Sequence, residues 1–219
     1  MRLARSTETR EVAIGPLQLA GMLGVPRAPT GIILFAHGSG SGRFSPRNNY
    51  VARAMREAGC ATLLLDLLTE EEAQERRNVF DIPLLAQRLL MATAWAKQEP
   101  GTATLPVCYF GASTGAAAAL VAAAAPGAWP IAAIVSRGGR PDLAGADLAE
   151  VKAPTLLIVG GDDPLVLDLN RAALAELQCE KHLVVVPGAT HLFEEPGALE
   201  AVADLASDWF ASHLAKVPA

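Results

Sequence analysis

The chain has 219 residues, of which 51% are hydrophobic and 19% charged, so its composition is that of a globular protein rather than a disordered one. Its 23 acidic and 18 basic residues give a net charge of −5, which disfavours nucleic acid as a partner.

The first part of the chain is predicted to form four strands and one helix. Residues 10–15 and 17–26 are predicted to be two short strands joined at a Gly-Pro turn. The runs 31–36 and 61–66 are continuously apolar, as expected of strands buried on both faces of a parallel sheet. Residues 45–59 have apolar side chains at helical spacing, with a proline near the start and a glycine at the end, and are predicted to be a helix.

The rest of the chain continues this alternation of strands and helices. The polar stretch 67–78 is predicted to be an exposed loop or a short surface helix, and Asp81 to cap a long helix that ends before Pro100. Further strands are predicted at 106–111, 129–136, 153–160 and 181–188, with helices at 116–125, 169–178 and 199–214. The pattern favours a single α/β domain over residues 1–219, with a mostly parallel sheet of about eight strands.

The serine of the segment GASTG, at 111–115, is the first candidate catalytic residue. The segment matches G-x-S-x-G, with Ser113 at its centre, and lies between an apolar strand and an alanine-rich helix. A serine at the tip of such a sharp turn has a strained backbone, and glycines at 111 and 115 remove the Cβ atoms that would clash there. The alternative is an ordinary glycine-bounded turn in which the serine is incidental.

A serine hydroxyl needs a neighbouring base, and in this arrangement the acid and then the histidine follow later in the chain. Asp162 and Asp163 follow one predicted strand, and His191 follows the next. The spacing D-x-x-V from Asp163 to Val166 favours Asp163 as the acid, with Asp162 as the alternative. Either aspartate could instead cap the following helix.

The remaining histidines are weaker candidates for the base. His182 begins a predicted strand, and His213 lies on the last helix, where we expect it at the surface. His37 precedes a glycine-rich loop at a strand end, and we expect it to shape that loop rather than to act as a base.

The glycine-rich loop HGSGSG, at 37–42, has two interpretations. It follows a strand and precedes a helix, and Asp66 ends the next strand, as in dinucleotide-binding sites. However, the third glycine of G-x-G-x-x-G is replaced by Arg43 or Ser45, depending on the register, and no G-K-[ST] follows. A nucleotide site is therefore disfavoured, and the loop is better suited to present a backbone N–H to a reacting oxygen.

Together, HGSGSG, GASTG, GGDDPLV and GATHLFEEPG resemble the α/β-hydrolase superfamily, in particular its small dienelactone-hydrolase-like branch. The resemblance covers nearly the whole chain and implies Ser113 as nucleophile, Asp163 as acid and His191 as base. It also implies an oxyanion hole formed by the backbone amides of Ser39 and Thr114. The chain departs from dienelactone hydrolases proper, which use a cysteine nucleophile, and it has room for no large cap between the sixth and seventh strands.

The predicted function is hydrolysis of small carboxylic esters through an acyl-enzyme, without a metal or organic cofactor. A thioesterase or lactonase would use the same apparatus, and a non-catalytic binding protein of this fold is a further alternative. Candidate substrate contacts are His37, Gly38 and Arg137. Arg137 and Arg140 could bind a substrate carboxylate, although an ion pair with Asp142 or another carboxylate is the simpler explanation.

The cellular setting is predicted from the cysteines and from the apolar segments. The three cysteines are far apart and contain no C-x-x-C pair, which disfavours a disulfide framework or a zinc site. The first fifteen residues lack the apolar stretch of a secretory signal, and the longest apolar run, 116–125, is too short to span a bilayer. We therefore expect a cytoplasmic protein whose partner is a small-molecule ester and neither a membrane nor a nucleic acid. The oligomeric state is not encoded in any of these patterns.

Overall fold

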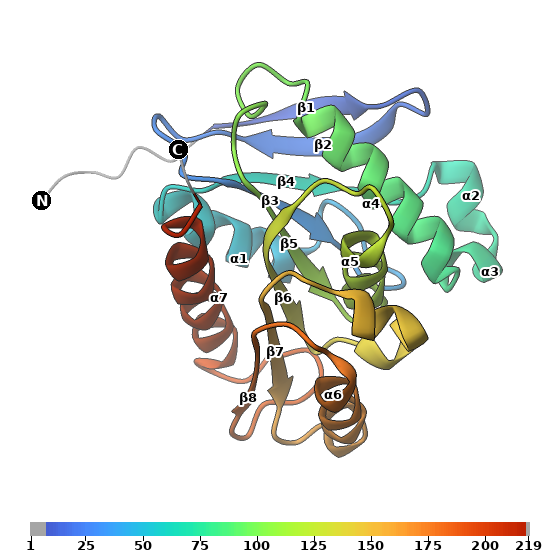
Figure 1. Cartoon of the computed structure of the whole chain (residues 1–219), viewed down its shortest axis with the longest axis vertical. Helices are drawn as coiled ribbons and strands as arrows, with labels where there is room; N and C mark the ends of the chain where they lie inside the picture. The colour runs from blue at the N-terminus through green and yellow to red at the C-terminus, as the bar shows by residue number, and fades with distance from the viewer. Residues whose placement is uncertain (1–7, 218–219) are drawn as a thin grey trace, which may run out of the picture.

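An eight-stranded sheet runs through the middle of the molecule, in the order β1-β2-β4-β3-β5-β6-β7-β8 (Figure 1). The computed structural model describes residues 8–217. β1 pairs with β2 and β2 with β4 in antiparallel fashion, and all the other pairs are parallel. The strands are β1 (Thr9–Ile14), β2 (Leu19–Gly24), β3 (Ile32–Ala36), β4 (Ala61–Leu65), β5 (Val107–Ala112), β6 (Ile131–Arg137), β7 (Thr155–Gly160) and β8 (Lys181–Val186).

Helices cover both faces of the sheet. α1 and α7 pack together on one face, whereas α4, α5, α6 and the 3₁₀ helix η1 lie on the other (Figure 1). The helices are α1 (Pro46–Glu57), α2 (Glu70–Gln74), α3 (Arg76–Val79), α4 (Ile82–Ala96), α5 (Thr114–Ala124), η1 (Pro141–Glu150), α6 (Pro164–Glu176) and α7 (Ala198–Leu214). No helix within residues 8–217 is long and apolar enough to cross a membrane.

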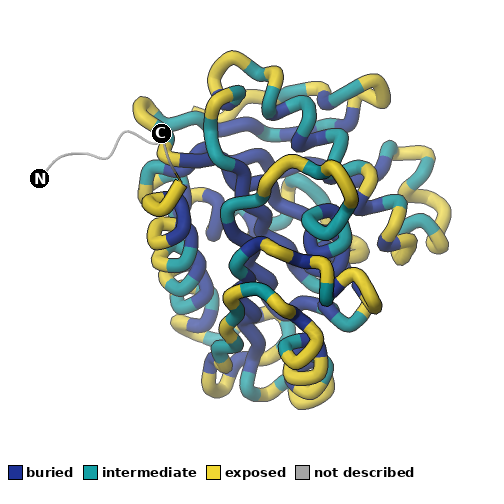
Figure 2. The backbone as a smooth tube through the Cα atoms, viewed as in Figure 1, coloured by how far each residue is buried: buried dark blue, intermediate teal, exposed yellow. Residues whose placement is uncertain are grey.

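The hydrophobic core is divided in two by the sheet. One half lies beneath α4 and α5 and contains Leu89 and Leu120, and the other lies beneath α1 and α7 and contains Met55 and Phe210. All residues of β3, β4 and β5 are buried, so both faces of these strands are covered (Figure 2). This explains why these strands are continuously apolar in sequence.

The predicted fold class is confirmed, with local differences. The polar stretch 67–78, predicted to be an exposed loop or a short surface helix, forms two short helices, α2 and α3, the second of which ends at Val79; neither helix has a buried residue. α6 begins at Pro164 rather than at 169, because a proline is favourable at the first helical position. The sequence pattern did not indicate this start, since Leu165 is 71% exposed and breaks the apolar spacing. The connection between β6 and β7 carries η1, which the sequence did not predict.

The expected surface position of His213 is wrong. Its residue is only 4% exposed, and its Nδ1 lies 2.7 Å from the carbonyl oxygen of Trp209. Ala206 and Phe210 precede it at helical spacing and are fully buried, so His213 lies on the face of α7 that packs against the sheet. Its ring is therefore part of the packed interior.

The sheet topology brings the candidate residues to one edge. The carboxyl ends of parallel strands share an edge of the sheet, and ligands of α/β proteins bind there. His37 follows β3, Ser113 follows β5, Asp163 follows β7 and His191 follows β8. Residues from distant parts of the chain can thus meet in one site.

Candidate active site

Ser113 occupies the strand–turn–helix position that its motif requires, between β5 and α5. Its backbone has φ 51° and ψ −124°, a strained conformation for a residue with a side chain. A Cβ on Gly111 would lie 2.4 Å from the Cα of Ala116, and one on Gly115 would lie 2.2 Å from the carbonyl oxygen of Ala36. The sharp turn therefore requires both glycines, as predicted.

His191 is held by Asp163. The imidazole Nδ1 lies 2.7 Å from Asp163 Oδ2, and the Asp163 side chain is 14% exposed. Asp163 is the N-cap residue of α6, but its side chain makes no capping hydrogen bond. Asp162 is exposed, and its backbone N–H donates to the carbonyl oxygen of Ala189. Of the two aspartates, only Asp163 therefore has its carboxylate on the histidine.

Ser113 and His191 line the same cavity, which has a volume of about 250 Å³ and is called the Ser113 cavity below. Gly138 lies beside the histidine, since a Cβ there would come within 3.0 Å of the His191 carbonyl oxygen. Gly38 borders the serine, because its Cβ would lie 2.8 Å from the Cβ of Ser113. The missing side chain at position 38 lets the glycine loop approach the candidate nucleophile closely.

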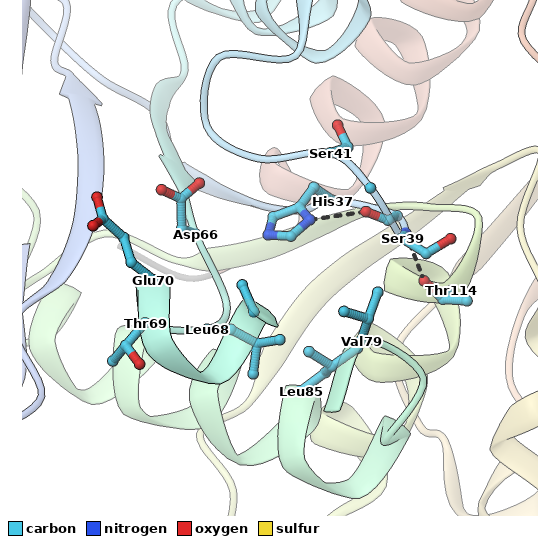
Figure 3. Close-up of a pocket in the computed structure, with 13 residues that line it drawn as sticks. His37, Ser39, Ser41, Asp66, Leu68, Thr69, Glu70, Val79, Leu85 and Thr114 are labelled. Carbon is cyan, nitrogen blue, oxygen red and sulfur yellow. Dashed lines mark hydrogen bonds between the residues drawn. The ribbon is translucent and has the colours of Figure 1, made fainter. Parts of the chain in front are cut away.

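The two predicted oxyanion-hole residues are in direct contact. The backbone N–H of Ser39 donates to Thr114 Oγ1 at 3.1 Å (Figure 3). Thr114 is the first residue of α5, where a backbone N–H has no partner within its own helix. A substrate oxygen could therefore receive the Thr114 N–H directly, whereas at Ser39 it must share or replace the threonine hydroxyl.

His37 spans the base of the glycine loop rather than pointing at the serine. Its Nε2 accepts the backbone N–H of Leu67 at 3.1 Å, so the proton is on Nδ1, which donates to the Gly38 carbonyl oxygen at 2.9 Å. Burial lowers the pKa of His37 below its ordinary value and keeps the ring neutral. This geometry agrees with a loop-shaping role, although the ring also borders a cavity.

Asp66 also holds the glycine loop. Its Oδ1 accepts the backbone N–H of Arg43 at 2.7 Å, and its carboxylate forms an ion pair with the Arg43 guanidinium. A Cβ on Gly42 would lie 2.6 Å from Asp66 Oδ1. The carboxylate that could have marked a ribose site thus has partners within the protein.

A second cavity lies beside the same loop and is called the Leu68 cavity (Figure 3). Its volume is about 280 Å³, and Leu68, Val79 and Leu85 line its apolar part. Thr114 also borders it. The Leu68 cavity could hold an apolar group of a ligand whose reacting atom lies near the loop.

The two arginines after β6 behave differently. Arg140 forms a bidentate ion pair with Asp142, at 2.9 and 2.8 Å. For Arg140, the predicted ion pair rather than substrate binding is therefore correct. Arg137 is buried and donates to Asn48 Oδ1 at 3.4 Å. It lines the Ser113 cavity, which is the position that substrate binding would require.

The sequence did not identify Arg47 and Asn48, which also line the Ser113 cavity. They lie in the first turn of α1, in the segment SPRNN, which is separated from the glycine loop by two residues. The helix start was visible in the sequence, but nothing in it indicated that α1 points at the serine turn. Within residues 8–217, no cluster of three or more His, Cys, Asp or Glu residues could hold a metal ion.

Comparisons with known proteins agree on the fold. The model of the dienelactone hydrolase family matches residues 19–214. The crystal structure of a dienelactone hydrolase from Anabaena variabilis is 56% identical, with a TM-score of 0.89 over 95% of this chain and 99% of that one. Est1E from Butyrivibrio proteoclasticus is 16% identical, with a TM-score of 0.78 over 95% and 99% of the two chains, and shares the fold.

Two curated proteins, from two strains of Mycobacterium tuberculosis, are 62% identical over 207 residues. Each carries a provisional name as a phosphoribosyl transferase. The match covers 94% of this chain but 46% of each relative, so the chain spans about half the length of the curated relatives that it matches.

Proposed function

The chain belongs to the dienelactone hydrolase family, and from this we propose that it is a serine hydrolase that cleaves small carboxylic esters through an acyl-enzyme on Ser113. Membership of the family supports a hydrolase activity. The observation that supports the finer assignment is the hydrogen bond of 2.7 Å between His191 and Asp163, with His191 and Ser113 on one cavity. The name of the curated relatives describes proteins of which this chain matches 46%, so it does not define the activity of this chain.

The proposed first half-reaction forms an ester on the serine. Asp163 holds the proton on His191 Nδ1, which leaves Nε2 as the basic nitrogen. Nε2 takes the hydroxyl proton of Ser113 while Oγ attacks the substrate carbonyl carbon. As the tetrahedral intermediate collapses, the bond to the alcohol oxygen breaks, and the imidazolium returns its proton to that oxygen.

The second half-reaction releases the acid. A water molecule gives a proton to His191 Nε2 and attacks the acyl carbon, after which the proton returns to Ser113 Oγ. In both halves the N–H groups of Ser39 and Thr114 are proposed to stabilise the oxyanion. One such donor typically contributes a factor of about 10²–10³ in rate. The Thr114 N–H also lies at the N-terminus of α5, where the helix dipole favours negative charge.

The Leu68 cavity is proposed to hold the apolar part of the substrate. It borders Ser39 and Thr114, so a carbonyl oxygen between their amides would place an attached chain at its entrance. Its volume, about 280 Å³, suits a short chain or a single ring. Esters, thioesters and lactones of that size would all fit, and a panel of the three would rank them.

Replacing Ser113 with alanine tests the proposal. We expect kcat for 4-nitrophenyl acetate to fall by about 10⁴-fold or more, because the nucleophile is lost. Ser39→Ala is the matched control, since it removes a neighbouring hydroxyl and leaves the Ser39 N–H in place, and it should keep most of the activity. Undiminished hydrolysis by Ser113→Ala would overturn the mechanism, and an inactive Ser39→Ala would show that the loop acts through its hydroxyl.

A further inference from the structure

Among residues 8–217, the Ser113 cavity is lined by two cations and by no carboxylate. Arg137 enters it from the end of β6 and Arg47 from the first turn of α1. Ser113 and His191 belong to the same lining. Although the chain carries a net charge of −5, this cavity therefore has a positive lining beside the proposed nucleophile.

In the part of the chain that the structure describes, Arg137 is a buried cation without a counter-ion. The residue is 7% exposed, and within residues 8–217 it forms no ion pair. Its Nη2 donates to Asn48 Oδ1 at a long 3.4 Å, and its guanidinium carbon lies 5.9 Å from the centre of the Phe193 ring. Its Nε has no hydrogen-bond partner among the described residues. Arg140, three residues later in the connection between β6 and η1, is paired with Asp142. An acidic side chain is therefore present nearby in the chain but pairs with the other arginine.

Burial of an unpaired charge opposes folding, and a guanidinium in that state has N–H donors available for an anion. Burial and the nearby charge of Arg47 lower the pKa of Arg137 to about 10. The side chain is therefore still protonated at neutral pH. A carboxylate or a phosphate matches the planar fork of guanidinium donors.

The surroundings of Arg137 increase the positive potential. The cavity faces the N-terminus of the twelve-residue helix α1, where Ser45 caps the first turn by accepting the N–H of Asn48. Arg47, in that turn, is paired with Glu194 at 2.9 Å, so its charge is partly offset. As far as the structure describes the chain (8–217), Arg137 is thus the cation of this cavity that lacks an acidic partner.

We propose that the Ser113 cavity binds an anionic group of the substrate, a carboxylate or a phosphate, through the guanidinium of Arg137. This assignment rests on the function proposed above and narrows its substrates to esters that carry a negative charge on one side of the reacting carbonyl. Gly38, Ser39 and Ser41 border both cavities, so the anionic side would lie against Arg137 and the apolar side in the Leu68 cavity. The substrate is then an ester with one charged half and one apolar half.

Matched substrates test the preference. The 4-nitrophenyl monoester of glutaric acid carries a carboxylate, 4-nitrophenyl pentanoate is its neutral counterpart, and the 4-nitrophenyl ester of 4-phosphonobutanoic acid carries a phosphonate instead. We expect the protein to have a kcat/KM at least about 10-fold higher for one of the anionic esters than for the neutral ester, the range for a hydrogen bond to a charged group. Whichever anionic ester is preferred distinguishes a carboxylate from a phosphate ligand.

Variants at Arg137 assign the preference to its guanidinium. Arg137→Gln should lower kcat/KM for the preferred anionic ester by about 10- to 100-fold and change kcat/KM for the neutral ester by less than about 3-fold. Arg137→Lys keeps the charge and should restore part of the preference. Arg140→Gln is the matched control, because that side chain is already paired with Asp142, and it should leave the preference unchanged.

Direct binding separates this inference from the proposed catalysis. Glutarate and inorganic phosphate are titrated into the Ser113→Ala protein by calorimetry, and at least one should bind. Binding should be lost in Ser113→Ala/Arg137→Gln and weakened, but still measurable, in Ser113→Ala/Arg137→Lys. No binding of either anion together with equal activity on charged and neutral esters would overturn the anion site. Binding without any ester hydrolysis would leave the anion site standing and refute the proposed function, and equal losses on all esters in Arg137→Gln would make Arg137 structural.

Discussion

Two adjacent aspartates after β7 have different surroundings. Asp163 meets His191 Nδ1 at 2.7 Å, whereas Asp162 is exposed. The motif order predicted an acid at this point of the chain and favoured Asp163, but side-chain direction in a turn depends on backbone angles that residue types alone do not specify. The same holds for Arg137: that it has no counter-ion within residues 8–217 becomes visible only when β6, α1 and the serine turn are placed together.

The aspartates give a prediction at the residue scale. Asp163→Asn should lower kcat by about 10⁴-fold, because the amide cannot hold the required tautomer of His191 or stabilise the imidazolium. Asp162→Asn should change kcat less than about 3-fold. Steady-state kinetics on 4-nitrophenyl acetate checks both, and a larger loss at position 162 would reassign the acid.

Close packing between α5 and β3 brings the serine turn to the glycine loop. Gly115 is in the first turn of α5, and its missing side chain lets the helix approach the carbonyl oxygens of Ala36 and His37. The sequence could predict this element pair, since a buried strand is continuously apolar and the glycines have fixed places in the motif. It could not predict η1, and it left open whether residues 67–78 form a loop or a short helix such as α2, because these helices bury few apolar residues or none and leave little periodic pattern.

Gly115 gives a prediction at the element scale. Gly115→Ala would place a Cβ 2.2 Å from the Ala36 carbonyl oxygen and 2.5 Å from that of His37, so we expect the free energy of unfolding to fall by about 3 kcal/mol. Gly101→Ala is the control, because its nearest neighbour would be 3.9 Å away, and it should change stability by less than about 1 kcal/mol. Urea denaturation of both variants measures the difference, and equal stabilities would contradict the close approach.

For the molecule as a whole, His37 couples the glycine loop to the polypeptide that follows β4. Its neutral ring accepts a hydrogen bond from Leu67 and donates one to Gly38, and burial lowers its pKa below 6.5. His37 therefore binds a proton at a higher pH in the unfolded chain than in the folded one. The contribution of neutral His37 to the free energy of unfolding is present above about pH 6.5 and is lost as the pH falls towards the lower pKa of the folded state. The overall topology was predictable from strand–helix alternation, but this link between two strand ends was not.

Because the pKa of His37 is lowered in the folded state, the protein should be less stable at acidic than at neutral pH. We expect the free energy of unfolding to be lower at pH 5.5 than at pH 7.5, with part of the difference abolished in His37→Gln, which has no titratable ring. Chemical denaturation at the two pH values measures both proteins. An identical pH dependence in the variant would show that His37 does not contribute to it.

The central claim, that Ser113 is an activated nucleophile, is tested most directly by covalent labelling. The protein is incubated with a fluorophosphonate, and the modified residue is located by mass spectrometry of its peptides. One adduct per chain is predicted, on Ser113, with labelling greatly slowed in Asp163→Asn and in a His191→Ala variant. Absence of an adduct on Ser113 in a protein that hydrolyses esters, or an adduct on another serine that accounts for the loss of activity, would contradict the claim.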